Sequence, residues 1–165
     1  MTIRQLFMHT SGLMYGGEDD NPAAAAYREA FAPYENADGD LKLFASILGK
    51  LPLAHQPGTK WHYSFSIDVL GYLIEVLTGK RFDAFLKERL FEPLGMVDTD
   101  FWVPPEKAGR LASLYGPAEP QYQPEGTLRV QRTPGLKALE SASESAYLRP
   151  KEFLSGGGGL VSTID

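Results

Sequence analysis

Few residues of this sequence stand in a pattern that is known to do chemistry. No serine has a lysine three positions later, no Lys-Thr-Gly occurs, and no Gly-x-Ser-x-Gly segment presents a nucleophile. There is no cysteine, and His9, His55 and His62 lack the spacing of metal-binding pairs. The glycine run 156–159 lacks the Gly-Lys-Ser/Thr ending of a phosphate-binding loop. We therefore expect neither a metal ion nor another cofactor.

The remaining candidates for chemistry are Tyr63, Ser64 and Ser66, just after the turn signal at 57–58. A phenol titrates near pH 10 in water, so a tyrosine acts as a base only where neighbouring cations favour the phenolate. By residue type alone, Tyr63 would be an aromatic that packs beside Trp61 at the start of a helix. Ser64 and Ser66 would be helix N-caps, each stabilising by about 1 kcal/mol.

The elements that must position these side chains are predicted to be short helices separated by loops. The strongest, 66–78, is apolar over most of its circumference and is followed by Gly79, so we expect it to be central to its domain. Thr2 and Gln5 form a capping-box pattern at the start of the first helix. Periodicity, caps and prolines predict helices over 2–9, 21–33, 38 or 40 to 48, 66–78 and 82–91.

The last third of the chain is less regular. Residues 101–103 suit a short strand and 104–110 a helical turn, whereas 116–150 is predicted to be a long irregular excursion with a hairpin around 127–130. A loop of this length in a compact domain is usually a lid, a binding loop or a mobile segment. Residues 155–163 are expected to lead into a helix that would begin where the sequence stops, which suggests truncation.

The composition fits one folded domain and argues against several partners. The chain has 165 residues, 43% hydrophobic and 22% charged, which is typical of a globular protein. Its net charge of −5 provides no basic face for phosphates, so no nucleic-acid partner is expected. No run approaches the roughly 18 apolar residues that a membrane span needs, and residues 1–4 do not begin a signal peptide.

Four segments, taken together and in order, form a recognisable pattern. They are Thr-Ile-Arg-Gln-Leu-Phe-Met-His-Thr-Ser-Gly-Leu at 2–13, Pro-Gly-Thr-Lys-Trp-His-Tyr-Ser at 57–64 with Asp-Val-Leu-Gly-Tyr-Leu-Ile-Glu at 68–75, Phe-Glu-Pro-Leu-Gly-Met-Val-Asp-Thr at 91–99, and Ser-Gly-Gly-Gly-Gly-Leu-Val-Ser-Thr at 155–163. This pattern resembles the penicillin-binding-protein/β-lactamase superfamily, in particular its class C β-lactamase-like and family VIII-like esterase branch. The resemblance covers nearly the whole chain and thins between 104 and 150.

The resemblance implies a fold. Residues 1–165 would be an internal fragment, a partial β-lactamase-like domain that corresponds to the helical region of the β-lactamase/transpeptidase-like fold. Such a fragment is mainly α and loop-rich with little or no sheet, because both sheet-forming ends would lie outside it. Residues 104–154 would form a long irregular or lid-like segment, and His9 would lie in a loop bordering the cleft.

The resemblance also implies a reaction. Enzymes of this superfamily attack a carbonyl with the serine of a Ser-x-x-Lys motif, and the lysine and a tyrosine transfer protons. Tyr63 matches that catalytic tyrosine, whereas the nucleophile motif and a third, substrate-binding motif would lie outside this chain. The family commonly has asparagine two residues after the tyrosine; Phe65 stands there, as in the esterase branch. Ser66 is then a candidate substrate-binding residue, and Ser64 remains a candidate helix cap.

Two functions follow from this pattern. The chain is expected to be a fragment of a serine hydrolase that cleaves small-molecule esters or amides, β-lactams among the candidates, through an acyl-enzyme; alone it would be inactive. The alternative is a non-catalytic binding or assembly module derived from the same fold. In either case the surface that the missing sheet would cover is exposed, so we expect self-association into a dimer or higher oligomer.

Overall fold

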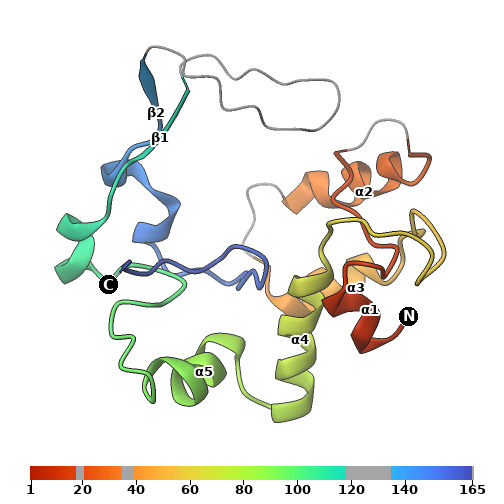
Figure 1. Cartoon of the computed structure of the whole chain (residues 1–165), viewed down its shortest axis with the longest axis horizontal. Helices are drawn as coiled ribbons and strands as arrows, with labels where there is room; N and C mark the ends of the chain where they lie inside the picture. The colour runs from red at the N-terminus through yellow and green to blue at the C-terminus, as the bar shows by residue number, and fades with distance from the viewer. Residues whose placement is uncertain (18–20, 35–38, 118–134, 165) are drawn as a thin grey trace. The chain divides into compact units, whose positions relative to one another are not determined.

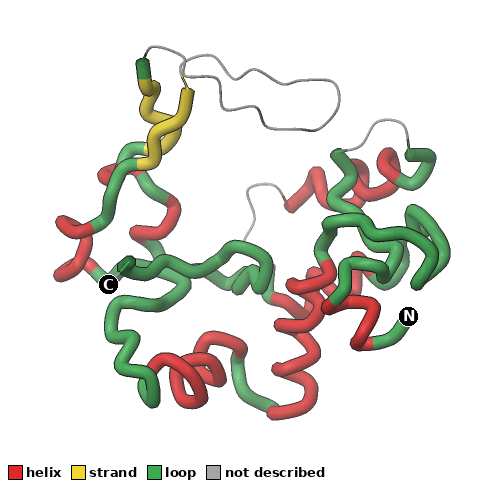
Figure 2. Tube along the Cα trace, viewed as in Figure 1, coloured by secondary structure: helices red, strands yellow, loops and turns green. Residues whose placement is uncertain are grey.

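The computed structural model describes residues 1–17, 21–34, 39–117 and 135–164. Figure 2 shows that these ranges consist of short helices joined by long loops, with strands confined to one pair. The expected mainly helical, sheet-poor architecture is thus confirmed for the described residues. The elements, labelled in Figure 1, are α1 (Ile3–Phe7), α2 (Ala24–Phe31), η1 (Ala32–Tyr34), α3 (Leu41–Leu48), α4 (Ser66–Thr78), α5 (Phe82–Leu86), η2 (Lys87–Phe91), η3 (Pro105–Arg110), β1 (Leu114–Pro117), β2 (Leu136–Glu140), η4 (Ala142–Glu144) and η5 (Ala146–Leu148).

Local hydrogen bonds explain where the helices begin and end. Gln5 N donates to Thr2 Oγ1 at 3.3 Å and Thr2 N donates to Gln5 Oε1 at 2.8 Å, which completes the predicted capping box of α1. Asp40 Oδ1 accepts from the third residue of α3 at 2.7 Å and caps that helix. Gly79 has φ 66° and ends α4 in the left-handed conformation. The bounds of α4 are those that the sequence predicts.

The helix predicted over 82–91 is divided in two. After α5 the chain continues as the π turn η2, in which Glu92 N donates to Lys87 O at 2.9 Å. In a π turn, residues five positions apart lie more nearly on the same side of the helix than they do in an α-helix. Leu86 and Phe91 are both buried in the same apolar cluster, which explains the change of pitch.

The strand predicted at 101–103 is not seen, and the helix expected to begin where the sequence stops lies outside the described residues. Instead Asp100 and Val161 pair as an isolated antiparallel bridge, with Asp100 N donating at 3.2 Å and Val161 N at 2.9 Å. Within 101–103, Val103 N donates to Tyr147 O at 2.7 Å rather than to a strand partner. The hairpin predicted at 127–130 lies outside the described residues.

The chain divides into two compact units, Met1–Phe101 with Lys151–Asp165, and Trp102–Pro150. In the second unit, β1 and β2 pair antiparallel with an irregularity between Leu114 and Tyr115. The 3₁₀ turns η3, η4 and η5 are further ordered elements among its described residues. The region expected to be irregular therefore contains short ordered elements.

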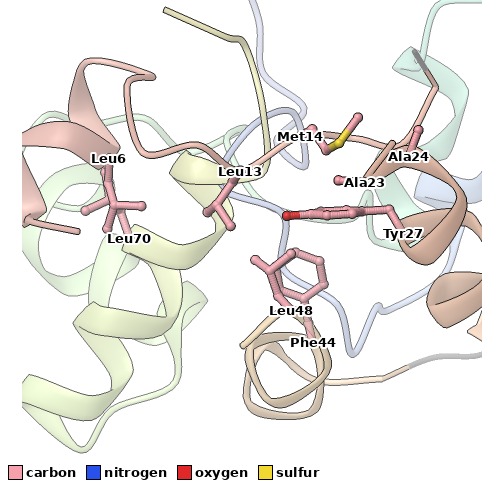
Figure 3. Packing of buried hydrophobic residues seen from close by; sticks show 9 residues of the cluster. All are labelled: Leu6, Leu13, Met14, Ala23, Ala24, Tyr27, Phe44, Leu48 and Leu70. Carbon is pink, nitrogen blue, oxygen red and sulfur yellow. The ribbon is translucent and has the colours of Figure 1, made fainter. Parts of the chain in front are cut away.

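Two apolar clusters form the core of the first unit. In Figure 3 the ring of Tyr27 lies between Ala23 and Met14 on one side and Leu48 and Phe44 on the other. The first cluster consists of Leu6, Leu13, Met14, Ala23, Ala24, Tyr27, Phe44, Leu48 and Leu70. The second consists of Leu41, Phe82, Leu86, Phe91, Phe101 and Leu154.

Helix α4 connects these clusters, since α1, α3 and α5 all contact it. A Cβ on Gly71 would lie 3.2 Å from the Phe82 ring and 3.4 Å from Leu41, so a small residue is needed at this crossing. The helix is central only in its first half, because Val76 and Leu77 are 59% and 72% exposed. In the described ranges, no helix is long and apolar enough to cross a membrane.

Candidate active site

A loop on each side of the site fixes the backbone that leads to Tyr63. The segment after α1 pairs with the segment before α4 through three backbone hydrogen bonds. Ala54 N donates to Gly12 O at 2.8 Å and Gly58 N donates to Thr10 O at 2.7 Å. His62 N donates to His9 O at 2.8 Å. Gly12 has φ 87°, and a Cβ there would overlap the carbonyl oxygen of His55. The close pairing therefore requires glycine at position 12.

The phenol of Tyr63 lies at the end of this pairing and reaches solvent. Its side chain is 47% exposed, directly before α4. The ring of His9 lies 4.5 Å away at 31°, and the ring of Tyr15 lies 5.7 Å away at 43°. The phenol is thus flanked by two rings and is open to an approaching group.

Tyr15 has an altered acidity. The pKa of Tyr15 is raised to about 12, mainly because its phenol is partly buried. The neighbouring carboxyl of Asp68 and the hydrogen bond between Tyr15 and Tyr63 raise this pKa further. The Tyr15 hydroxyl therefore keeps its proton at physiological pH and can donate a hydrogen bond. Its ring is held edge-on against Phe65, 4.4 Å between centroids.

Asp68 fixes the glycine-rich turn to the start of α4. Its carboxyl group is buried and accepts a hydrogen bond from Ser155 Oγ at 2.6 Å and from Gly157 N at 3.4 Å. A Cβ on Gly156 would lie 2.6 Å from the carbonyl oxygen of Ile67, so the turn packs directly on the helix backbone. This contact places the turn next to Tyr15, because a Cβ on Gly157 would lie 3.6 Å from the Tyr15 hydroxyl.

Three buried serines, Ser11, Ser64 and Ser66, form a hydrogen-bonded cluster at the start of α4. Ser66 Oγ lies 2.8 Å from Ser11 Oγ and 2.8 Å from Ser64 Oγ, and Leu13 N donates to Ser11 Oγ at 3.2 Å. Ser64 does not cap α4, since the N-cap position is Phe65 and no side chain bonds there. Ser66, the candidate substrate-binding residue, has no exposed surface, so its hydroxyl joins two segments rather than facing an open site.

Two aromatic residues near the tyrosine differ in their surroundings. Trp61 is 63% exposed and touches the ring of His9 edge-on, at 6.2 Å. Phe65, at the position where the resemblance implies asparagine, packs on Phe31 and Phe44 in the core. Position 65 therefore supplies an aromatic side chain to the core and no amide to the site.

The sequence predicted Tyr63 as a site residue and His9 beside the cleft, and the structure brings these two rings together. Tyr15 and Asp68 were not considered as site residues, although an acidic residue within an otherwise apolar helix was a signal for Asp68. The histidines do not form a metal site in the described part of the chain, where no three His, Cys, Asp or Glu side chains are grouped to hold an ion. The arrangement as a whole can move a proton at the phenol oxygen of Tyr63.

Comparison with known proteins gives consistent matches. A sequence model of the Beta-lactamase family matches residues 1–165. Esterase EstB of Burkholderia gladioli is 32% identical over 168 residues, 100% of this chain and 42% of that protein. An uncharacterized protein of Mycobacterium tuberculosis is 31% identical over 163 residues, 99% of this chain and 36% of that protein. The chain thus spans less than half the length of these relatives.

Solved structures give the same result. EstCE1, a hydrolase with promiscuous acyltransferase activity, superposes with a TM-score of 0.67 at 26% identity, covering 98% of this chain and 42% of that one. A mutant form of simvastatin synthase (LovD) of Aspergillus terreus superposes with a TM-score of 0.64 at 26% identity. The match covers 99% of this chain and 33% of that one.

Proposed function

Because the chain belongs to the Beta-lactamase family, we propose that it is the helical part of a serine hydrolase that cleaves ester or amide bonds through an acyl-enzyme. Tyr63 is the proton-transfer residue in this proposal. The observation that carries it is the exposed phenol at the start of α4, flanked by His9 and Tyr15. An esterase and an acyltransferase among the similar proteins support the reaction class.

The proposed reaction begins with a serine supplied by polypeptide outside these 165 residues, which hold no Ser-x-x-Lys. The serine oxygen attacks the carbonyl carbon while its proton passes to the Tyr63 phenolate. The bond to the leaving group then breaks, and Tyr63 gives that proton to the departing oxygen or nitrogen. Water attacks the acyl-enzyme in the same way, losing a proton to Tyr63, and the serine recovers that proton.

The neighbours of Tyr63 support this role. A phenolate needs donors to stabilise it, and the Tyr15 hydroxyl stays protonated because its pKa is raised to about 12. The lysine of the missing motif would supply the positive charge. Phe65 provides no amide group for a β-lactam, so we expect esters to be better substrates than β-lactams.

A pair of tyrosine variants tests the role of Tyr63. In the complete gene product that contains these residues, Tyr63→Phe should lower kcat on a chromogenic ester by about 10²–10⁴, the usual contribution of general acid–base catalysis. Tyr115→Phe is the control, since Tyr115 is also an exposed tyrosine but belongs to the other unit. The kcat of this variant should be unchanged. Full turnover by Tyr63→Phe would contradict the proposal.

The isolated chain provides a second test. Purified residues 1–165 should show no burst and no turnover with a chromogenic ester or a cephalosporin, because no activated serine is present. If the isolated chain does turn over substrate, and Tyr63→Phe leaves that rate unchanged, the role assigned to Tyr63 is contradicted.

The alternative, a binding or assembly module without catalysis, is favoured by the exposure of large apolar side chains such as Phe7 and Leu77. The coding sequence next to these residues separates the two functions. An in-frame Ser-x-x-Lys upstream supports the hydrolase, and its absence supports the module.

A further inference from the structure

His9 has two features that are unfavourable in a folded chain. Its φ is 51°, the one positive value among non-glycine residues of the described ranges. Its Nδ1 atom is buried and has no hydrogen-bond partner in that part of the chain. Such features persist only where the surrounding structure imposes them, and they are concentrated at functional sites.

The left-handed backbone of His9 determines where its ring lies. His9 N donates to Leu6 O at 3.1 Å as α1 ends, and His9 O accepts from His62 N at 2.8 Å. Between these two bonds the chain reverses, and the imidazole comes to lie on Tyr63 with 4.5 Å between ring centroids and 31° between planes. The strained turn thus places one face of the His9 ring against the phenol of Tyr63.

Besides His9, the side chain of Tyr63 is held by Tyr15, its hydrogen-bonding neighbour. Nearly half of that side chain is exposed, and its other ring neighbour in the described residues, Tyr15, is farther away at 5.7 Å. A half-exposed tyrosine would otherwise exchange between rotamers. The imidazole of His9 is the closer of the two surfaces that restrict it.

We infer that His9 is a positioning residue for Tyr63: its left-handed backbone presents the imidazole face that keeps the phenol oriented for proton transfer. This inference rests on the proposed function of Tyr63. Because a misplacement of about 1 Å can lower a rate by up to 10², loss of the ring should lower kcat while leaving KM nearly unchanged.

The test uses substitutions that separate ring from backbone. His9→Asn removes the ring, and asparagine tolerates positive φ; His9→Gly does the same with no steric cost. In the complete protein, each should lower kcat on a chromogenic ester by about tenfold. His55→Asn is the matched control, because His55 also has a buried ring nitrogen without a partner but makes no ring contact with Tyr63. Its kcat should match the wild type.

A double-mutant cycle distinguishes positioning from a general structural role. In a Tyr63→Phe background, His9→Asn should cause no further loss of kcat, because the hydroxyl that it orients is absent. An equal loss in both backgrounds, or wild-type kcat for His9→Asn and His9→Gly, would overturn the inference. A Tyr63→Phe enzyme with full activity would instead overturn the proposed function.

Nuclear magnetic resonance of residues 1–165 gives a readout without activity. The ring signals of Tyr63, identified by their loss in Tyr63→Phe, should move in His9→Asn and stay in place in His55→Asn. The same spectra report whether each variant is folded. Unmoved Tyr63 signals in a folded His9→Asn chain would contradict the contact itself.

Discussion

At the scale of single residues, the site is a series of polar groups that run inward from the exposed phenol. Tyr63 is open to solvent, Tyr15 lies beside it, and Asp68 is buried behind Tyr15. A buried carboxyl requires hydrogen-bond donors, and Ser155 and Gly157 provide them. Electrostatic interaction along this series can be measured in two ways.

The first prediction concerns the acidity of Tyr15. Its pKa is about 12 in the folded chain against an ordinary value of 10.0, so the folded state holds this proton more tightly. The stabilisation that this provides is complete below pH 10 and is lost as the pH rises toward 12. Burial also raises the pKa of Tyr27. In a titration followed by the ultraviolet absorbance of tyrosinate, Tyr15 and Tyr27 should therefore ionise late.

The variant Tyr15→Phe checks this assignment. It should reduce the late component and leave the part that is due to Tyr27. Its free energy of unfolding should also fall less than that of the wild type between pH 10 and 12. A late component of undiminished size in Tyr15→Phe would contradict the assignment to Tyr15.

The second prediction concerns Asp68. Asp68→Ala leaves the partly buried Ser155 hydroxyl without its acceptor and takes away one of the two acceptors of Gly157 N–H, so the free energy of unfolding should fall by about 1–3 kcal/mol. Urea unfolding measures this loss. In combination with Ser155→Ala the two losses should not add, with a coupling of roughly 0.5 kcal/mol or more; strict additivity would mean that the 2.6 Å bond does not form in solution.

At the scale of elements, the site depends on the pairing between the loop after α1 and the loop before α4. Three backbone hydrogen bonds join these loops. Two of the glycines there, Gly12 and Gly58, have φ values of 87° and 88° that other residues rarely adopt. The loops are therefore a fixed support for Tyr63.

The third prediction tests this support. Gly12→Ala places a methyl group against the His55 carbonyl in a left-handed backbone, so it should destabilise the chain by about 2 kcal/mol or more. Gly17→Ala is the control, because nothing lies within 4 Å of its Cβ position and its φ is not left-handed. Urea unfolding of both variants makes the comparison, and equal stabilities would contradict the close approach.

At the scale of the whole molecule, several large apolar side chains of the described residues are exposed. Leu77, Phe7 and Leu94 are each about two thirds exposed or more. Exposed apolar groups of this size promote association. Self-association is therefore the fourth prediction, and light scattering of residues 1–165 should give a mass above that of the monomer.

The end of α4 is suitable for testing this association. Val76→Lys with Leu77→Lys should lower the mass toward the monomer, with the free energy of unfolding changed by less than about 0.5 kcal/mol because both residues are exposed. Lysine is also favourable in the last turn of a helix. A wild-type chain that is monomeric at all concentrations would contradict the prediction.

The sequence alone determined the features that depend on neighbours a few residues away. The capping box of Thr2 and Gln5, the cap at Asp40 and the limits of α4 all follow from hydrogen bonds and periodicity within one or two turns. The motifs around Tyr63 and the glycine run also sufficed to indicate the family, because they are contiguous in the chain.

The tertiary structure decided what those local patterns could not. The apolar pattern of α4 predicts that Leu77 is buried and Asp68 is not, whereas Asp68 is buried and Leu77 is exposed. The elements that pack on each end of the helix decide this. Ser11 meets Ser66 across 55 positions and Asp68 meets Ser155 across 87. Contacts at such separations form only when the elements between them are folded, so the neighbours that hold Tyr63 could not be read from spacing.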